Sequence, residues 1–260
     1  MILDKIVAKT KIRISNLKNE KSLDEIKTEA EAMPLNLNFP FECALKTKDI
    51  SFICEVKKAS PSKGLIARDF PYLSIALEYE AAGASAISVL TEPDFFLGDN
   101  KYLSDIAKSV KIPVLRKDFI IDPYQIYEAK CIGASAILLI CSLLDTKTIS
   151  EYISTAENLG LSALVEAHNK EEVESAVKAG AKIIGINNRN LKTFEVNINN
   201  SINLREFVPE NVLFVSESGI KTCSDIKKLR EINADAVLIG ETLMCSKDKK
   251  KALQELRGAF

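Results

Sequence analysis

Phe52-Ile53-Cys54-Glu55-Val56-Lys57-Lys58-Ala59-Ser60-Pro61-Ser62-Lys63-Gly64 is an apolar run that leads into charged residues and then into a turn. A short apolar run bounded by Pro and Gly is typical of a buried strand. Glu55 and Lys57 are two residues apart, so both side chains should project from one face near the C-terminal end of that strand. An isolated pair of this kind is more often a weak surface ion pair, so its meaning depends on the rest of the chain.

Four similar segments follow and divide the chain into repeating units. They are Gly83-Ala84-Ser85-Ala86-Ile87, Gly133-Ala134-Ser135-Ala136-Ile137, Gly180-Ala181-Lys182-Ile183-Ile184 and Asn233-Ala234-Asp235-Ala236-Val237. Each closes an amphipathic segment and opens an apolar one, because Gly or Asn supplies the left-handed cap of a helix and the β-branched residues start a strand. Such recurrence is typical of repeated strand–helix units.

The pattern predicts eight strands separated by helices. We expect the strands to end near Lys57, Thr91, Lys117, Ile140, Glu166, Asn187, Ser216 and Ile239. Asn169 and Thr222 are the expected N-caps of two helices, each with an acidic residue three positions later. Strands that are apolar on both faces belong to a parallel sheet covered by helices. Eight units in about 210 residues favour a closed (β/α)₈ TIM barrel over an open doubly wound sheet.

Residues 1–48 precede the predicted barrel, which occupies residues 49–260 of the same single domain. The apolar residues of segment 2–17 have the spacing of an amphipathic helix, and segment 41–46 favours a short helix after several helix breakers. Phe41 and Leu45 offer an apolar face directly before the first strand. We therefore expect this N-terminal helical extension to lie over the C-terminal mouth of the barrel.

Composition narrows the classes of partner. The 260 residues are 47% apolar and 27% charged with a net charge of −1, which is ordinary for a globular protein. Acidic residues accompany the lysines throughout, so we expect no nucleic acid partner, and any phosphate ligand should be small. The sequence shows neither a signal peptide nor an apolar run long enough to span a bilayer. We expect a cytoplasmic protein without a membrane partner.

Cysteine and histidine offer few candidates for chemistry. The six cysteines include no C-x-x-C pair, and we expect buried free thiols. The only histidine, His168, cannot build a His-rich metal site, and a nucleophilic triad would lack its usual base. We expect no metal site, and we do not place His168 among the catalytic residues.

Polar residues follow the predicted strands at the points where these end. They are Glu55, Lys57, Lys117, Glu166, Asn187, Arg189, Glu217, Ser218 and Gly240. In a TIM barrel the active site is built from the C-terminal ends of the strands and the loops after them. Charges that are partly desolvated there must be paired or functional. The alternative is a ring of ion pairs that satisfy one another.

The last two strands carry a second signal, a glycine directly after each apolar run. The segments are Ser216-Glu217-Ser218-Gly219-Ile220 and Leu238-Ile239-Gly240-Glu241-Thr242-Leu243-Met244. Glycine lets backbone N–H groups approach an anion, and residues 241–244 would open a short helix. These loops predict a phosphate site. Because a carboxylate repels phosphate, we expect Glu241 to contribute only its backbone.

At this point the motifs resemble those of the indole-3-glycerol phosphate synthase family along the whole chain. They are Glu-Val-Lys-Lys-Ala-Ser-Pro-Ser (55–62), Leu-Arg-Lys-Asp-Phe (115–119), Leu-Val-Glu (164–166), Gly-Ile-Asn-Asn-Arg-Asn-Leu (185–191), Ser-Glu-Ser-Gly-Ile (216–220) and Leu-Ile-Gly-Glu-Thr-Leu-Met (238–244). The Ser-Pro-Ser and Lys-Asp-Phe motifs are specific to this family among phosphate-binding barrels. The two glycine loops are shared by many of those barrels.

The resemblance implies closure of an indole ring from 1-(2-carboxyphenylamino)-1-deoxyribulose 5-phosphate, with release of carbon dioxide and water, in tryptophan biosynthesis. It implies no metal or organic cofactor. Lys117 resembles the general acid, Glu166 the general base in dehydration and Lys57 the partner of the substrate carboxylate. Glu55, Asn187 and Ser218 complete the catalytic set. The other residues expected at the substrate are Ser60, Pro61, Phe119, Leu138, Arg189, Leu191, Glu217, Leu238 and Glu241, with the phosphate on Gly219 and Gly240.

The chemistry itself requires such residues. A carbonyl that is attacked by an aryl ring must be protonated, and the later loss of water needs an acid and a base. Two other functions stay open on the sequence: a Schiff-base aldolase with Lys117 as nucleophile, and a phosphate-binding barrel without catalysis. Oligomeric state and any docked enzyme of the pathway are not predicted.

Overall fold

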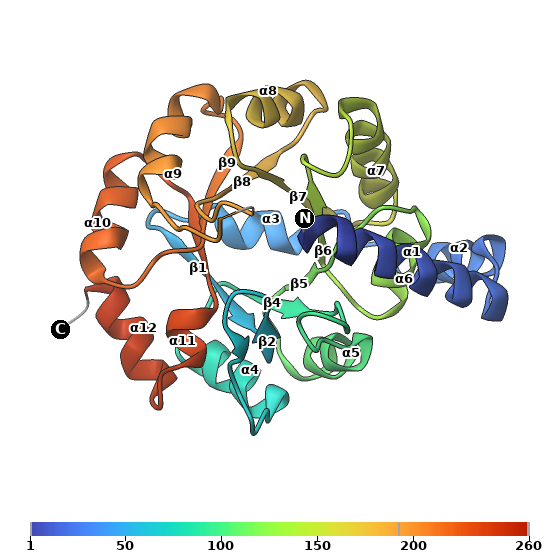
Figure 1. The fold of residues 1–260 in the computed structure, drawn as a ribbon, viewed down its shortest axis with the longest axis horizontal. Coiled ribbons are helices and arrows are strands. Elements are labelled where there is room, and N and C mark those ends of the chain that lie inside the picture. Colours follow the sequence, from blue (N-terminus) through green and yellow to red (C-terminus); the bar gives the residue numbers. More distant parts are fainter. Residues whose placement is uncertain (1, 192, 259–260) are drawn as a thin grey trace.

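The computed structural model describes residues 2–191 and 193–258, so residues 1, 192, 259 and 260 of the predicted domain lie outside it. Eight parallel strands close into a barrel in the order β1-β10-β9-β8-β7-β6-β5-β4 (Figure 1). They are β1 (Ser51–Val56), β4 (Ala86–Leu90), β5 (Val114–Lys117), β6 (Ala136–Ile140), β7 (Ser162–Ala167), β8 (Ile183–Asn187), β9 (Leu213–Glu217) and β10 (Ala236–Ile239). The barrel closes because β1 pairs with both β10 and β4. The predicted (β/α)₈ barrel with an N-terminal helical extension is confirmed.

Helices surround the barrel and follow its strands (Figure 1). They are α4 (Tyr72–Ala81), α5 (Asn100–Ser109), α6 (Tyr124–Cys131), α7 (Thr146–Asn158), α8 (Lys170–Lys178), α9 (Asn199–Leu204), η1 (Arg205–Phe207), α10 (Cys223–Glu231), α11 (Glu241–Met244) and α12 (Lys249–Arg257). The sequence did not predict the small hairpin of β2 (Ala59–Ser60) and β3 (Gly64–Leu65), which lies in the loop after β1. This hairpin carries the Ser-Pro-Ser motif.

The predicted ends of the barrel strands lie within one residue of the observed ends. The two predicted N-caps are also confirmed. The side chain of Asn169 accepts a hydrogen bond from the backbone N–H of Glu172, and Thr222 forms a reciprocal capping box with Asp225. These local signals work because each cap satisfies backbone groups that a helix end leaves without partners.

Side chains alternate between the inside of the barrel and the helix layer. In β1, Phe52 and Cys54 pack in the cluster between barrel and helices, whereas Ile53 belongs to the cluster inside the barrel. The period of two therefore also turns Glu55 inward, one step nearer the mouth. The same alternation places Lys117, Glu166 and Glu217 above apolar inward residues of their own strands. The charged residues thus form the top layer of an otherwise apolar barrel interior.

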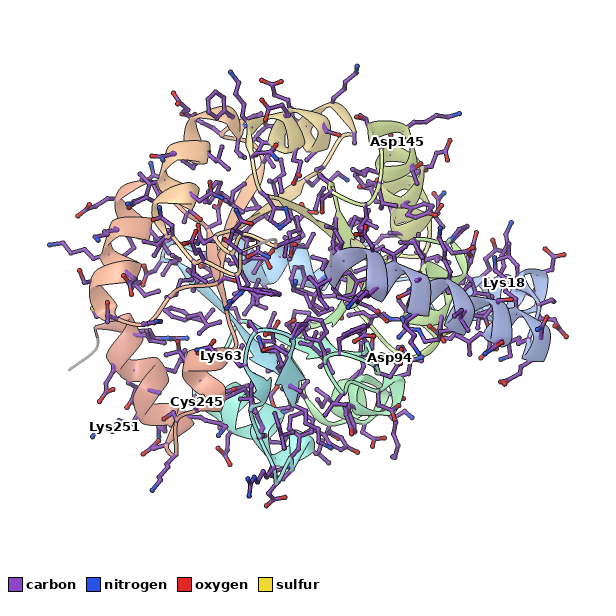
Figure 2. The ribbon with its side chains drawn as sticks, viewed as in Figure 1. Lys18, Lys63, Asp94, Asp145, Cys245 and Lys251 are labelled. Atoms are coloured by element: carbon purple, nitrogen blue, oxygen red, sulfur yellow. The ribbon has the colours of Figure 1, made fainter. Side chains whose placement is uncertain are left out.

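The N-terminal helices are α1 (Ile2–Glu20), α2 (Leu23–Ala32) and α3 (Pro40–Leu45), and of these α1 and α3 lie at opposite ends of the barrel. The start of α1 covers the mouth, where Ile2, Leu3 and Ile6 line the same pocket as the charged strand ends. The far end of α1 extends past the ring together with α2, and Lys18 there contacts Asp122 at 2.7 Å (Figure 2).

The expectation that Phe41 and Leu45 face the mouth is wrong. Both side chains pack among the first inward residues of the strands, Ala136 and Ile183 among them. The hydroxyl of Ser51, at the start of β1, also donates a hydrogen bond to the carbonyl of Ala44. Helix α3 therefore closes the N-terminal end of the barrel, because an apolar face indicates burial but does not specify which end it covers.

Two smaller expectations have separate outcomes. Across the described residues, no helix has the length and apolar character that crossing a membrane requires. The six cysteines are free thiols, but only Cys54 is buried, and Cys43, Cys223 and Cys245 are exposed. The expectation of buried thiols is therefore wrong for these three, which occupy solvent-facing positions.

Candidate active site

The mouth of the barrel contains a pocket of about 310 Å³ that is closed on one side by the start of α1. Pockets of this size accommodate small molecules. All seventeen residues that the sequence placed in the catalytic and substrate sets line it: Glu55, Lys57, Ser60, Pro61, Lys117, Phe119, Leu138, Glu166, Asn187, Arg189, Leu191, Glu217, Ser218, Gly219, Leu238, Gly240 and Glu241. The structure brings them together from seven of the eight barrel strands and the loops after them. Their individual roles stay predictions.

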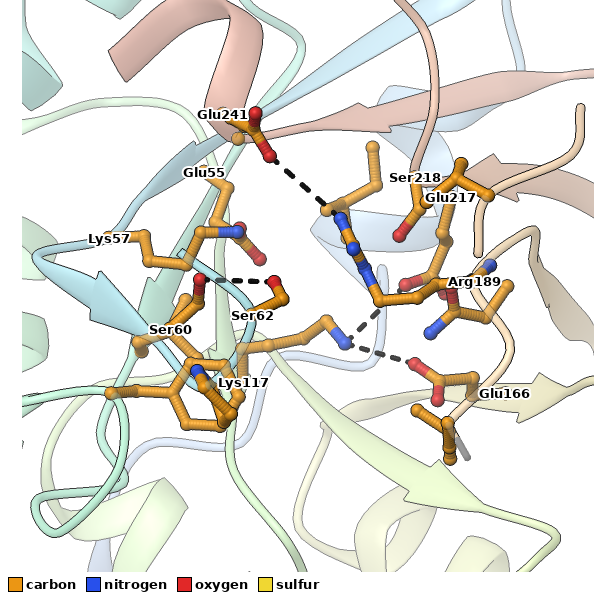
Figure 3. A pocket seen from close by; sticks show the side chains of 18 of the residues that line it. Glu55, Lys57, Ser60, Ser62, Lys117, Glu166, Arg189, Glu217, Ser218 and Glu241 are labelled. Atoms are coloured by element: carbon orange, nitrogen blue, oxygen red, sulfur yellow. Dashed lines mark hydrogen bonds and ion pairs between the residues drawn. The ribbon is translucent and has the colours of Figure 1, made fainter. Parts of the chain in front are cut away.

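Lys117 lies at the centre of the charged layer and reaches across the pocket to two carboxylates (Figure 3). Its Nζ donates to Oε2 of Glu166 at 3.0 Å and lies 3.4 Å from Oε2 of Glu217. Burial alone would lower the pKa of Lys117, but these two glutamates and Glu55 raise it above its usual range. Lys117 is therefore an ammonium at any pH at which the protein works.

The two carboxylates beside Lys117 titrate differently although both are buried. Burial opposes ionisation of Glu166, but Lys117 and His168 hold its pKa well below the usual range. Burial raises the pKa of Glu217 to about 7, because Lys117 opposes this only in part while Glu166 and Glu55 add to it. Environments that separate the pKa values of neighbouring acids are typical of acid–base sites.

The residue Glu217 is 2% exposed, and its Oε1 has no hydrogen-bond partner among the described residues. It occupies space that Gly185 on the neighbouring strand leaves open, since a Cβ there would collide with it. A ring of mutually satisfied ion pairs would not leave a buried oxygen unpaired. This orphaned oxygen favours a functional site over the structural alternative.

The predicted pair of Glu55 and Lys57 forms as expected, with Nζ of Lys57 2.5 Å from Oε1 of Glu55. Glu55 is buried, whereas the Lys57 side chain keeps 17% of its surface exposed toward the pocket. Gly240 makes this arrangement possible, because a Cβ at that position would collide with the carboxylate. The glycine therefore has a steric reason in addition to its expected place in a phosphate-binding loop.

The Glu241 carboxylate contacts two basic side chains. It lies 3.0 Å from Nζ of Lys63, on the loop after β1. It also lies 3.9 Å from Arg189, on the loop after β8 (Figure 3). These contacts hold two basic side chains beside the two glycine loops. That Glu241 contributes only its backbone to a phosphate site stays a prediction.

Sequence reasoning missed Asn188, although it stands within a quoted motif. This buried side chain donates to the carbonyl of Ser218 at 3.1 Å and to Oγ of Ser216 at 3.0 Å, and its own oxygen accepts from Ser201. Ser218 has a φ of +67° and Gly219 a φ of +83°, so the loop after β9 turns through two left-handed residues. Asn188 fixes this strained turn, which local sequence cannot show.

A second missed group connects α1 to the strand of Lys117. Arg13 donates to both carboxylate oxygens of Asp118 at 2.9 and 3.0 Å. Asp118 also accepts from the backbone N–H of Phe119, at 2.8 Å, and from Thr91. Arg13 and Asp118 are 105 residues apart, so only the fold reveals that the N-terminal helix braces the residues on either side of this carboxylate.

The geometry supports one kind of chemistry. A charged ammonium, an ionised carboxylate and a carboxyl group that titrates near neutral pH meet in a pocket with an apolar wall that includes Phe96 and Phe119, whose rings are 5.9 Å apart. Such a set can protonate a carbonyl and remove a proton from the same ligand. A Schiff-base lysine needs a lowered pKa, which the environment of Lys117 opposes.

The chain is similar to known proteins over nearly its whole length. A protein-family model described as indole-3-glycerol phosphate synthase matches residues 3–256. The indole-3-glycerol phosphate synthase of Ruminiclostridium cellulolyticum is 63% identical over 259 residues, which is 100% of both chains. The enzyme of that name from Endomicrobium trichonymphae is 58% identical and covers 99% of this chain and 100% of its own.

Solved structures show the same architecture at low identity. A structure of 3-hexulose-6-phosphate synthase has a TM-score of 0.66 and 16% identity, and covers 81% of this chain and 100% of its own. KGPDC from Streptococcus mutans has a TM-score of 0.64 and 10% identity, and covers 81% and 97% of the two chains. At these identities the comparison supports the barrel fold alone.

Proposed function

The chain belongs to the indole-3-glycerol phosphate synthase family, and on this premise we propose which residues of the pocket perform each step. The enzyme is a decarboxylating lyase of tryptophan biosynthesis. It closes the indole ring of 1-(2-carboxyphenylamino)-1-deoxyribulose 5-phosphate with loss of carbon dioxide and water. The observation that supports our assignment is the contact of Lys117 with Glu166 in the pocket.

Lys117 acts as the general acid of ring closure. The aryl carbon attacks the sugar carbonyl, a C–C bond forms, and the carbonyl oxygen takes a proton from the ammonium as its negative charge develops. Lys117 lies among Glu166, Glu217 and Glu55, which keep it protonated until the substrate arrives. The aryl ring then loses carbon dioxide from the carbon that attacked, and the electrons of the broken C–C bond make this ring aromatic again.

Glu166 acts as the general base of dehydration. The hydroxyl group made in the first step leaves as water with one proton from an acid, while Glu166 accepts a proton from the substrate. Its carboxylate is ionised because the neighbouring cations lower its pKa. Asn187 ends β8, Ser218 follows the neighbouring strand β9, and both line the pocket, where they can orient the sugar hydroxyls.

Lys57 binds the carboxylate of the substrate. Glu55 holds its ammonium at 2.5 Å, so the charge is positioned before the substrate enters. The apolar wall, which includes Pro61, Phe119 and Leu138, then surrounds the aromatic ring.

The phosphate binds between the loops after β9 and β10. Gly219 and Gly240 line this side of the pocket, and Lys63 and Arg189 are held there by Glu241. Backbone amides and basic side chains together form the usual phosphate site of a barrel. Phosphate binding would release both basic side chains from Glu241.

The experiment is a fluorescence assay for the indole product with the carboxyphenylamino substrate. We expect Lys117→Ala to lower kcat by about 10² to 10⁴, with a smaller effect on KM, because the proton is transferred only on the way to the transition state. Lys108→Ala, at an exposed position of α5, is the control. If Lys117→Ala mainly raised KM, Lys117 would be a binding residue and the assignment would be wrong.

A further inference from the structure

His168, the only histidine in the chain, lies behind Glu166 in the turn between β7 and α8. Its Nε2 is 3.3 Å from Oε1 of Glu166, and its Nδ1 is 2.9 Å from Oε2 of Glu172 in the first turn of α8. The backbone N–H of His168 donates to the same Glu172 oxygen at 2.8 Å. The imidazole ring is therefore fixed between two carboxylates, one in the pocket and one outside it.

This position defines the charge of the ring. A neutral imidazole has one N–H donor, whereas both ring nitrogens of His168 face a carboxylate oxygen. Only the imidazolium form offers a donor to each of them. Burial would lower the pKa of His168, but Glu166 and Glu172 raise it to about 10. The ring is thus a cation at neutral pH.

The two oxygens of Glu166 have different partners. Oε2 accepts a well-formed hydrogen bond from Lys117 at 3.0 Å, on the pocket side. Nε2 of His168 approaches Oε1 as an ion pair that is not aligned as a hydrogen bond. When Lys117 turns to the substrate and gives up its proton, Glu166 loses its first partner. Contacts of this kind tighten when the substrate complex forms.

We propose that His168 is a positioning residue which, as an imidazolium held by Glu172, keeps Glu166 ionised and oriented while Lys117 serves the substrate. The inference rests on the proposed role of Glu166 as general base. His168 is not among the pocket-lining residues of the described chain, so it acts through Glu166 and not on the substrate. It deepens the acid–base assignment by adding a second cation on the side away from the ligand.

Other described groups face Glu166 and His168 from several helices, strands and loops. They are Lys117 on β5, Glu217 on β9, Glu55 on β1, the thiol of Cys141 after β6, and Asn200 on α9, whose side chain donates to the carbonyl of His168. Glu217 and Glu55 are acidic, and the charge of Glu217 opposes the ionisation of Glu166. Lys117 and His168 are the two cations that offset them.

The first test is the titration of the single imidazole by NMR, with ¹⁵N-histidine in the full-length chain without an affinity tag. We expect both ring nitrogens to stay protonated through pH 8. In Glu172→Gln the ring keeps an acceptor but loses one negative charge, so its pKa should fall. Glu171→Gln changes the same charge on an exposed neighbour and should leave the titration unchanged. A wild-type ring that titrates near its usual pKa of about 6.5 would overturn the proposal.

The second test is the pH dependence of kcat in His168→Gln. Loss of a cation at 3.3 Å raises the pKa of Glu166, so the acid limb of kcat should move to higher pH by about one unit or more. KM should change less than about twofold, because uniform binding is not affected. A lower kcat with an unchanged acid limb would show a merely structural role and would also overturn the proposal.

The controls separate this inference from the proposed function. If the wild-type protein formed no indole product, the proposed function itself would be wrong, and the proposed role of His168 would be wrong with it. If the wild type was active, Lys117→Ala was inactive, and His168→Gln kept the wild-type acid limb, only the inference would fail. If His168→Gln does not fold, the acid limb of Glu172→Gln decides, because a weaker imidazolium should shift it in the same direction by a smaller amount.

Discussion

Replacing Glu217 by Gln should make the protein more stable at alkaline pH while it impairs the enzyme. Glu217 is 2% exposed, its Oε1 has no hydrogen-bond partner among the described residues, and it shares Lys117 with Glu166. Burial and the nearby carboxylates raise its pKa to about 7 from the ordinary value of 4.5. The folded protein therefore binds a proton at Glu217 over a pH range in which the unfolded chain has already released it.

The sign of the effect follows from this difference. Where the folded state binds more protons than the unfolded state, stability falls as the pH rises. The loss begins above the unfolded pKa, near 4.5, and is complete above about pH 7, where it amounts to roughly 3 kcal/mol. Glutamine carries no titrating proton, so Glu217→Gln escapes this loss. For a chain of this size about 3 kcal/mol corresponds to an increase in Tm of roughly 6 to 12 °C.

The assay is thermal unfolding followed by circular dichroism at pH 5 and pH 8.5. We expect the Tm of Glu217→Gln to exceed that of the wild type at pH 8.5 and to be close to it at pH 5. Glu210→Gln, which removes an exposed carboxylate, should give the same small difference at both values. If Glu217→Gln were less stable than the wild type at pH 8.5 and not at pH 5, Glu217 would be a well-paired carboxylate and the electrostatic reasoning would be refuted.

Three further predictions follow from the contacts in the pocket. Lys57→Ala should mainly raise KM in steady-state assays, since an anchored carboxylate is bound alike in ground and transition states; a predominant loss of kcat would reverse the roles of the two lysines. Gly240→Ala should lower kcat/KM by about tenfold or more, because its Cβ would displace Glu55, and inorganic phosphate should inhibit it more weakly; unchanged inhibition would contradict the placement of the phosphate. Arg13→Ala should cost about 1.5 to 3 kcal/mol of stability, because Asp118 loses its bidentate partner but keeps Arg116 at 3.3 Å, and a Tm equal to that of the wild type would exclude the proposed brace.

Much of the fold could be predicted because the determining signals are local. A glycine or asparagine after each helix, an apolar run and a polar strand end recur often enough to count the units. The alternation of inward and outward residues then places Glu55, Lys117 and Glu166 in one layer without any knowledge of their distances. At these positions the period of two in the sequence predicts the same inward side that the barrel structure shows.

What could not be predicted depends on partners that are distant in sequence. The apolar face of α3 was evident from Phe41 and Leu45, yet hydrophobicity does not tell the two ends of a barrel apart. Asp118 has its partner Arg13 105 residues away. His168 carried no signal beyond its residue type, because a single histidine predicts neither a His-rich metal site nor a nucleophilic triad. Its significance comes from lying between two carboxylates.

The pocket meets its anionic substrate with cations that already have partners. Lys57, Lys63, Lys117 and Arg189 each lie within 4 Å of a glutamate side chain in the structure. On the proposed assignment, substrate binding is an exchange of partners: the substrate carboxylate and phosphate take cations that are oriented and partly desolvated in advance. Preorganised charges of this kind favour the transition state, because little reorganisation remains when the new charge develops. Every glutamate that gives up a cation must then be stabilised in another way, and for Glu166 the structure provides the imidazolium of His168.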